Sequence, residues 1–142
     1  MVKVTSAVII GIEAATIDVE VDIRAGLPGF EIVGLAGPAV KESRERIRSA
    51  LKNSGFNYPL HKIVINLAPA DIRKNGTLYD LPIALGILAG MGCIPIEQLQ
   101  RYIVVGELSL DGKLRGVPGM ICIAELAARH RKLLLIPEEN GS

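Results

Sequence analysis

The sequence predicts an α/β fold, an α+β sandwich in which helices pack on one mixed sheet, with residues 1–142 forming a single domain. Residues 16–24 alternate apolar and charged side chains with a period of two, which is typical of a half-exposed strand. Residues 38–53 have an apolar stripe at helical spacing, and residues 62–67 form a short apolar run rich in β-branched side chains. With 49% hydrophobic and only 4% aromatic residues, the core is expected to be aliphatic.

The first half of the chain contains most of the predicted strands. The strands at residues 2–10 and 16–24 are expected to form a hairpin around residues 12–15. Pro38 suits the first turn of a helix, and Gly55 suits its C-terminal cap. In order, we expect strands at residues 2–10, 16–24, 30–33 and 62–67, and a helix at residues 38–53.

The second half begins with a polar loop, residues 68–77, that runs into an apolar helix. Asp111-Gly112 is a strong turn signal, so residues 102–105 and 107–110 are expected to form a hairpin pair. The remaining predicted elements are helices at residues 80–91 and 119–131 and a strand at residues 133–136.

Composition limits the classes of function. A net charge of +1 argues neither for nor against a nucleic-acid partner. Cys93 and Cys122 lack metal-ligand or CxxC spacing, so we expect buried, reduced thiols in a cytoplasmic protein. No signal peptide is expected, because the chain starts with strand-like sequence. The longest uncharged run, residues 81–96, is too short and too rich in proline and glycine for a membrane span, which predicts a soluble protein.

Motifs for cofactors and metals are weak. The nearest match to a phosphate-binding P-loop, residues 106–113, is one residue too long and is followed by Leu114 rather than a hydroxyl residue. His61 and His130 are far apart and belong to no ligand cluster; both are expected to be structural, His130 at a helix end. We therefore expect no metal site and no cofactor in this domain.

The loop before residue 80 is a candidate for nucleophilic chemistry, because loops that open a helix often hold a nucleophile or a phosphate. Thr77 is the candidate hydroxyl in this loop; Ser43 and Ser54 are the others near helix ends, and no GxSxG elbow is present. Thr77 serves equally well as a turn residue. Asp80 is interpreted as a helix cap ahead of Pro82, in preference to a lone carboxylate in a cleft.

Basic residues recur along one face of the first predicted helix, and two more lie in the loop. Such a stripe could contact phosphates, remain a solvated face, or pair with a neighbouring subunit. The candidate nucleic-acid-binding residues are Lys41, Arg44, Arg48, Lys52, Arg73 and Lys74.

Four segments, residues 33–56, 65–71, 80–88 and 106–112, closely resemble the YifB/ComM family of magnesium-chelatase-like proteins. The resemblance spans nearly the whole chain but only the N-terminal, Lon-protease-like domain of that family. It implies the fold of the Lon protease C-terminal domain, which is shared with the second domain of a small-subunit ribosomal protein. In that family an AAA+ ATPase module, which binds ATP and Mg, follows this domain and is absent from this chain.

The same resemblance implies that the domain is not an enzyme. Lon-type proteases use a Ser–Lys dyad, and the serine's place falls at about Leu78 or Tyr79. The lysine's place falls near residues 120–122, and no lysine occurs between Lys113 and Lys132. We therefore expect no catalytic residue here.

The function implied by the resemblance is that of a non-catalytic accessory and oligomerisation domain of a ComM-like AAA+ ATPase. The full-length protein is then expected to be a hexameric DNA branch-migration helicase of natural transformation, with its own AAA+ module, further copies and DNA as partners. One alternative is a divergent Lon-like, ATP-dependent serine/threonine peptidase domain. The other is a partner of a magnesium-chelatase-type ATPase.

Overall fold

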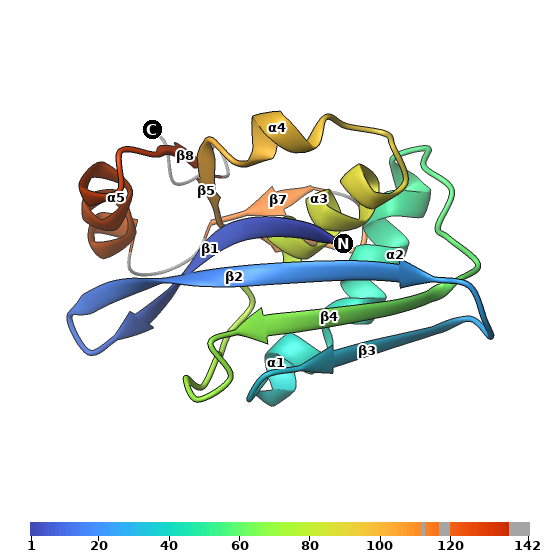
Figure 1. The fold of residues 1–142 in the computed structure, drawn as a ribbon, viewed down its shortest axis with the longest axis horizontal. Coiled ribbons are helices and arrows are strands. Elements are labelled where there is room, and N and C mark those ends of the chain that lie inside the picture. The colour runs from blue at the N-terminus through green and yellow to red at the C-terminus, as the bar shows by residue number, and fades with distance from the viewer. Residues whose placement is uncertain (112, 117–119, 137–142) are drawn as a thin grey trace.

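The structure, a computed structural model, describes residues 1–111, 113–116 and 120–136. Strands and helices are mixed along the chain, and they form a layered α/β domain (Figure 1). In chain order they are β1 (Val2–Ile10), β2 (Glu13–Arg24), β3 (Gly29–Val33), α1 (Pro38–Lys41), α2 (Ser43–Asn53), β4 (Lys62–Ala68), α3 (Asp80–Gly90), α4 (Ile96–Leu99), β5 (Tyr102–Val104), β6 (Glu107–Leu108), β7 (Leu114–Arg115), α5 (Met120–Arg129) and β8 (Leu133–Leu135).

The main sheet has four strands in the order β1-β2-β4-β3. β2 pairs antiparallel with both β1 and β4, whereas β3 pairs parallel with β4, so the predicted mixed sheet is confirmed. The β1–β2 hairpin is also confirmed, but its turn is shorter than predicted: Ile10 pairs with Glu13, which leaves Gly11 and Ile12 at the tip. Gly11 has a φ of 64°, a conformation that favours glycine.

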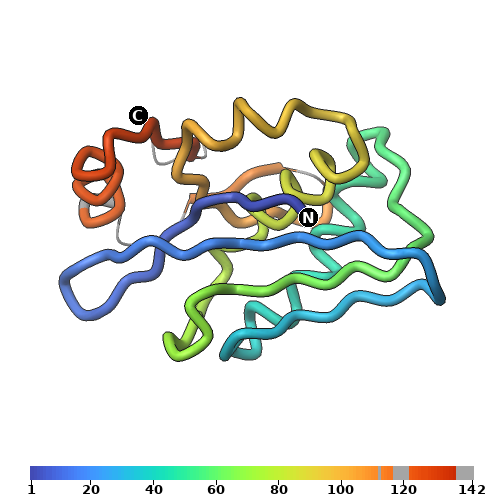
Figure 2. The backbone as a smooth tube through the Cα atoms, viewed as in Figure 1, coloured from blue at the N-terminus to red at the C-terminus, as the bar shows by residue number. Residues whose placement is uncertain are grey.

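Helices cover one face of this sheet, as the backbone trace in Figure 2 shows for α2 and α3. α3 lies against β1 and β2 and also contacts α2 and β6. A Cβ atom at Gly86 would lie 2.5 Å from Cγ2 of Val21, so a glycine there permits the close approach of α3 to β2. Because all sides of α3 meet other elements, nearly every one of its residues is buried.

The remaining strands form two small sheets, of which β5–β8 lies beyond β1 and β6–β7 lies against α2 and α3. β5 and β8 pair in parallel, and β6 pairs antiparallel with β7. The Ser6 hydroxyl on β1 donates a 2.7 Å hydrogen bond to the carbonyl oxygen of Val104, which joins β5 to the main sheet. The C-terminal helix α5 packs against β2 and β8.

Several predicted elements differ in detail. The single helix predicted over residues 38–53 is divided at Glu42 into α1 and α2. The hairpin predicted between residues 102–105 and 107–110 is wrong: β5 pairs with β8, and the hairpin is instead β6–β7. Ser109 N–H donates to Lys113 O at 2.9 Å across the predicted turn, of which Gly112 lies outside the described residues. The short helix α4 was not predicted.

The cysteines also differ from expectation. Cys93 is exposed, so the prediction that it is buried is wrong, and Cys122 is half-buried; both are free thiols. Cys93 follows the end of α3, directly after Gly92, which has a φ of 79°. Within the part of the chain that the structure describes, no helix has the length and apolar character needed to cross a membrane.

Candidate functional site

Four of the six candidate basic residues line one face of the helical layer. Lys41 ends α1, and Arg44, Arg48 and Lys52 recur at three- and four-residue spacing on α2. All four side chains are exposed, while Ile47, Ala50 and Leu51 face the core. The amphipathic pattern of α2 therefore directs its cations to solvent as predicted.

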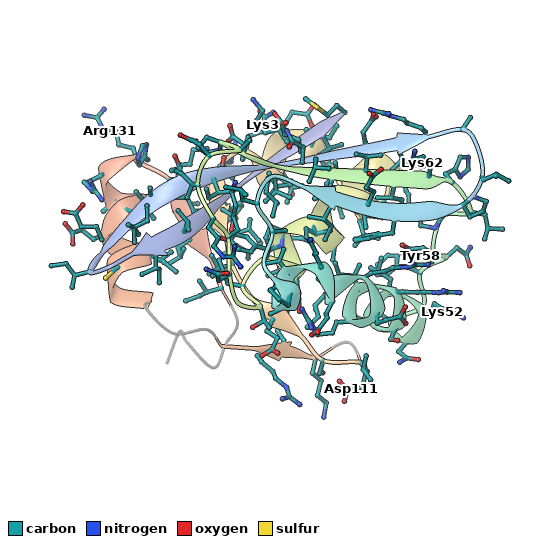
Figure 3. The ribbon with its side chains drawn as sticks, turned by 90° about the horizontal axis from the view of Figure 1, so that it is seen from below. Lys3, Lys52, Tyr58, Lys62, Asp111 and Arg131 are labelled. Atoms are coloured by element: carbon teal, nitrogen blue, oxygen red, sulfur yellow. The ribbon has the colours of Figure 1, made fainter. Side chains whose placement is uncertain are left out.

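A pocket of about 570 Å³ opens at the C-terminal end of this face. Arg48 and Lys52 form one wall, and the segment 55–60 after α2 forms the other. The Arg48 guanidinium lies 5.9 Å from the centre of the Tyr58 ring, within cation–π range. Figure 3 shows Lys52 and Tyr58 on the same side of the molecule. The pocket thus combines cations with aromatic surface.

The sequence prediction missed the aromatic half of this pocket. Phe56 is 38% exposed and Leu60 is 80% exposed, although both are large apolar side chains. Burial raises the pKa of the Tyr58 hydroxyl, and Arg44 and Arg48 act in the opposite direction. Two aromatic residues directly after a helix with a basic face were the available signal, because basic and aromatic side chains together are typical of single-stranded nucleic-acid sites.

A second hollow, of about 630 Å³, separates β3 from α1. Its wall is mostly apolar and includes Val33, Leu35 and Pro38, and its rim has two cations, Lys41 and Arg73. Arg73 is exposed, and its Nε donates to Oδ1 of Asn75 at 3.2 Å. Lys41 and Arg73 therefore share this hollow, whereas Arg48 and Lys52 share the aromatic pocket. Arg44 lies between these two groups, in a surface depression that it shares with Lys41.

Lys74 is not a surface residue, in contrast to the expectation that it could contact phosphates. Its side chain is fully buried, and its Nζ donates to the carbonyl oxygens of Gly34, at 2.7 Å, and of Pro69. Burial lowers the pKa of the Lys74 ammonium, while Asp71 raises it. The polar residues on either side of Lys74 in the sequence do not indicate that its side chain points into the core.

Asp80 is a buried ion-pair partner rather than the predicted helix cap. It is the first residue of α3, and the structure shows no side-chain capping bond there. Its carboxylate accepts from Arg46 Nε at 2.6 Å and Arg46 Nη2 at 3.0 Å, and from Leu108 N–H at 3.1 Å. Burial raises the pKa of the Asp80 carboxyl, against the opposing effect of these hydrogen bonds. The pair fastens α2 to α3 and β6.

The position of Arg46 was also missed. Arg46 lies four residues after Glu42, at the spacing of an intrahelical ion pair, but its guanidinium reaches Asp80 across the interhelical contact. Its Nη2 also donates to Ala39 O at 2.7 Å, so the guanidinium additionally joins α1 to α2.

The hydroxyl and dyad positions offer little chemistry. Leu78 and Tyr79, which occupy the serine's place, are both buried in the core. Thr77 is half-buried, and its carbonyl accepts from Asp80 N–H at 3.3 Å, as in a turn. The hydroxyl of Ser43 is buried, whereas Ser54 is exposed at the end of α2. Of the lysine's place, residues 120–122, only the Cys122 side chain lies within the described residues.

Among the described residues, no three His, Cys, Asp or Glu side chains come close enough to hold a metal ion. His61 and His130 are both exposed, the latter directly after α5. In the described part of the chain, the basic face with its two hollows therefore remains the candidate site.

The sequence profile of the family described as the ChlI subunit of Mg-chelatase matches residues 19–140. The protein YifB of Escherichia coli is 49% identical over 131 residues, and the competence protein ComM of Haemophilus influenzae is 43% identical over 132 residues. These alignments cover 92% and 93% of this chain but 26% of each relative. A Lon protease of Brevibacillus choshinensis is 25% identical over 135 residues, 88% of this chain and 17% of its own. The chain thus spans about a quarter of the length of YifB and ComM.

Proposed function

The chain belongs to the family of the ChlI subunit of Mg-chelatase, and from that premise we propose that it is a non-catalytic accessory domain of a ComM-like AAA+ ATPase. In this proposal the domain assembles copies of the full-length protein and contacts DNA, and the full-length protein is a branch-migration helicase. The competence name of the 43% identical relative supports this role. ATP and Mg would bind to the module outside this chain.

The observation on which DNA contact depends is the pocket where Arg48 and Lys52 face Phe56 and Tyr58. Cations there can neutralise phosphates, and an exposed aromatic ring offers a stacking surface to an unpaired base. Arg44 extends the cationic surface along the same helix. This combination favours single-stranded segments, which branched DNA exposes, over intact duplex.

The experiment is a titration of labelled single-stranded and branched DNA with the full-length protein at two salt concentrations. Arg44→Glu/Arg48→Glu is expected to weaken binding at least tenfold at low salt and to reduce the salt slope by about two. Phe56→Ala is expected to weaken single-stranded binding by about 1–3 kcal/mol with little change in the slope, because it removes stacking and no charge.

Lys3→Glu/Arg131→Glu is the matched control, since it reverses two charges on exposed residues well away from Lys52 and Tyr58 (Figure 3). If this control weakens binding as much as the α2 variant, or if neither changes it, the basic face is an ordinary solvated surface.

The peptidase alternative has a separate test. Similarity to a Lon protease supports the peptidase alternative. Burial of Leu78 and Tyr79, which occupy the position of the Lon-type serine, argues against a peptidase reaction there. We expect the full-length protein not to hydrolyse casein in the presence of ATP. Hydrolysis that disappears in Thr77→Ala would instead establish a divergent hydroxyl peptidase.

A further inference from the structure

We propose that copies of this chain bind one another by inserting the β1–β2 turn of one copy into the groove between β3 and α1 of the next. The turn surface consists of Ile10, Ile12 and Glu13; the groove surface consists of Val33, Leu35, Pro38, Lys41 and Arg73. The inference rests on the self-association part of the proposed function and assigns the two surfaces that perform it.

The first observation is the backbone of Leu35, which has a φ of 55° while its side chain is 51% exposed. The left-handed region is costly for a branched side chain and is normally left to glycine or asparagine. Solvent exposure gives this leucine little packing energy in return. Such strain, where the surrounding structure maintains it, points to a functional role for the displayed side chain.

The surrounding structure does maintain it. Lys74 N–H donates to the Leu35 carbonyl at 3.0 Å, and the buried Lys74 ammonium donates to Gly34 O at 2.7 Å. Gly37 N–H in turn donates to Lys74 O at 2.8 Å. A Cβ atom at Gly34 would lie 2.2 Å from the carbonyl oxygen of Leu67, so the loop is pressed directly onto β4. Interior contacts therefore fix the loop that holds Leu35 outward.

The second observation is the edge of the sheet beside that loop. β3 is an edge strand, and no other described strand pairs with its outer side. Val33, at its end, is 41% exposed. The opposite edge strand, β1, is bonded to β5 through Ser6. An unpaired edge with exposed apolar side chains is a ready surface for association with another chain.

The third observation is the β1–β2 turn, which has the complementary character. Ile12 is 90% exposed and Ile10 is 54% exposed at a two-residue turn that begins with Gly11, where asparagine, aspartate or serine usually follows the glycine. Exposed Glu13 supplies a carboxylate for the cations Lys41 and Arg73 at the groove. Cys122 Sγ donates to Ile12 O at 3.1 Å, so α5 supports the turn from behind.

Charge favours this turn over the exposed apolar segment that follows α2. Phe56 and Leu60 are also exposed, but they share their pocket with Arg48 and Lys52, cations of the same sign as those at the groove. A carboxylate-bearing apolar turn complements the groove, and a second basic surface does not.

The two surfaces cannot meet within one copy. The strand pairing places Asp18 opposite Ala68, and Val33 lies beside Asn66, so Leu35 lies near the level of Asp18. Ile12 is six residues further along β2, roughly 20 Å at about 3.3 Å per residue. The contact therefore joins unlike surfaces of two copies, which closes a ring or extends as a filament according to the rotation between them.

The decisive experiment mixes two variants of the full-length protein that each carry one added cysteine, Ile12→Cys and Leu35→Cys, under mild oxidation. We expect a disulfide between residues 12 and 35, identified by mass spectrometry of tryptic peptides, only when both variants are present. Each variant alone is the control for reactions of Cys93, Cys122 and any other thiol. Cross-linking of residue 35 to a different segment, or none at all, overturns the proposal.

Leu35→Gly distinguishes an interface residue from a structural one. Glycine accepts the observed φ without strain, so the melting temperature of the dissociated protein should stay unchanged or rise. Self-association measured by analytical ultracentrifugation should nevertheless weaken at least tenfold. Loss of folding stability with unaltered association would contradict the proposal.

Charge exchange is the third arm of the test. Glu13→Lys and Lys41→Glu should each weaken association, and the double exchange should restore it. A wild-type protein that is monomeric at every concentration overturns both the proposed assembly role and this interface. Self-association that none of these variants weakens overturns only the proposed interface.

Discussion

Lys74 and Asp80 lie six residues apart on one segment, and both side chains are fully buried, yet their surroundings differ. Asp80 meets an opposite charge, the guanidinium of Arg46, and a backbone N–H. Lys74 meets only carbonyl oxygens, and no described carboxylate forms an ion pair with it. One segment thus buries one compensated charge and one uncompensated charge.

The two buried charges stabilise different parts of the molecule. The Arg46–Asp80 pair joins α2, α3 and β6 inside the helical layer, where two opposite charges share the cost of desolvation. Lys74 instead fixes an external loop around Leu35. Carbonyl dipoles accept its hydrogen bonds, and Asp71 acts on its charge without forming an ion pair. The ion-paired Asp80 therefore stabilises the core, whereas Lys74, which has no ion pair among the described residues, holds the exposed loop around Leu35 in place.

The largest expected effect comes from breaking the compensated pair. Asp80→Ala leaves the Arg46 guanidinium and the Leu108 N–H without their acceptor, so the free energy of unfolding should fall by about 3–5 kcal/mol. Urea unfolding of this chain, followed by circular dichroism, measures the change.

The double variant Arg46→Leu/Asp80→Ala is the control. Its loss should be clearly smaller than the sum of the two single losses, because neither charge is then left alone. Additive losses would show that the two side chains do not act as a pair.

A smaller effect is expected at the uncompensated charge. Lys74→Met removes the donor from the carbonyls of Gly34 and Pro69 and also removes a desolvated cation, so the two changes partly cancel. The expected loss is about 1–3 kcal/mol by the same urea measurement at neutral pH. A loss as large as that of Asp80→Ala would erase the distinction between the two sites.

The pH dependence sharpens the same comparison. Because burial lowers the pKa of Lys74, the unfolded chain binds this proton more tightly than the folded chain. Stability from this residue therefore rises with pH through the interval below the ordinary value of 10.5 and is level above it. The difference in unfolding free energy between wild type and Lys74→Met should widen as pH increases there. A difference that narrows would contradict the direction of the shift.

The smallest effect is expected at an uncharged neighbour between them. The Tyr79 hydroxyl is buried, finds no hydrogen-bond partner among the described residues, and has its pKa raised by burial. Tyr79→Phe removes that polar atom and keeps the ring, so the free energy of unfolding should change by less than about 1 kcal/mol, toward greater stability. A loss above that range would reveal a partner for the hydroxyl.

Elements with strong local patterns were predictable from the sequence. The alternation in β2, the run in β4 and the helix α3 are all confirmed, because each depends on residues within one element. The pairing of β5 with β8 was missed because the two strands are far apart in the sequence. Local patterns do not encode which distant strand completes a pair.

The residues of the candidate site likewise include some that were predictable from local sequence and some that were not. Exposure of Arg44, Arg48 and Lys52 follows from helical spacing and was predictable. Burial of Lys74 and the pairing of Asp80 with Arg46 depend on how separate elements approach one another. A lysine in a polar loop and an aspartate at the start of a helix have the same local sequence pattern whether they face solvent or the core.

The position of α3 has a consequence for folding. This helix lies between β1 and β2 on one side and α2 and β6 on others, and its residues from Asp80 to Ala89 are almost all buried. An apolar helix without a solvent face has no stable place until both neighbouring layers have formed. Its amide protons should therefore exchange with solvent only when the whole domain opens, so that their exchange rates report the global free energy of unfolding.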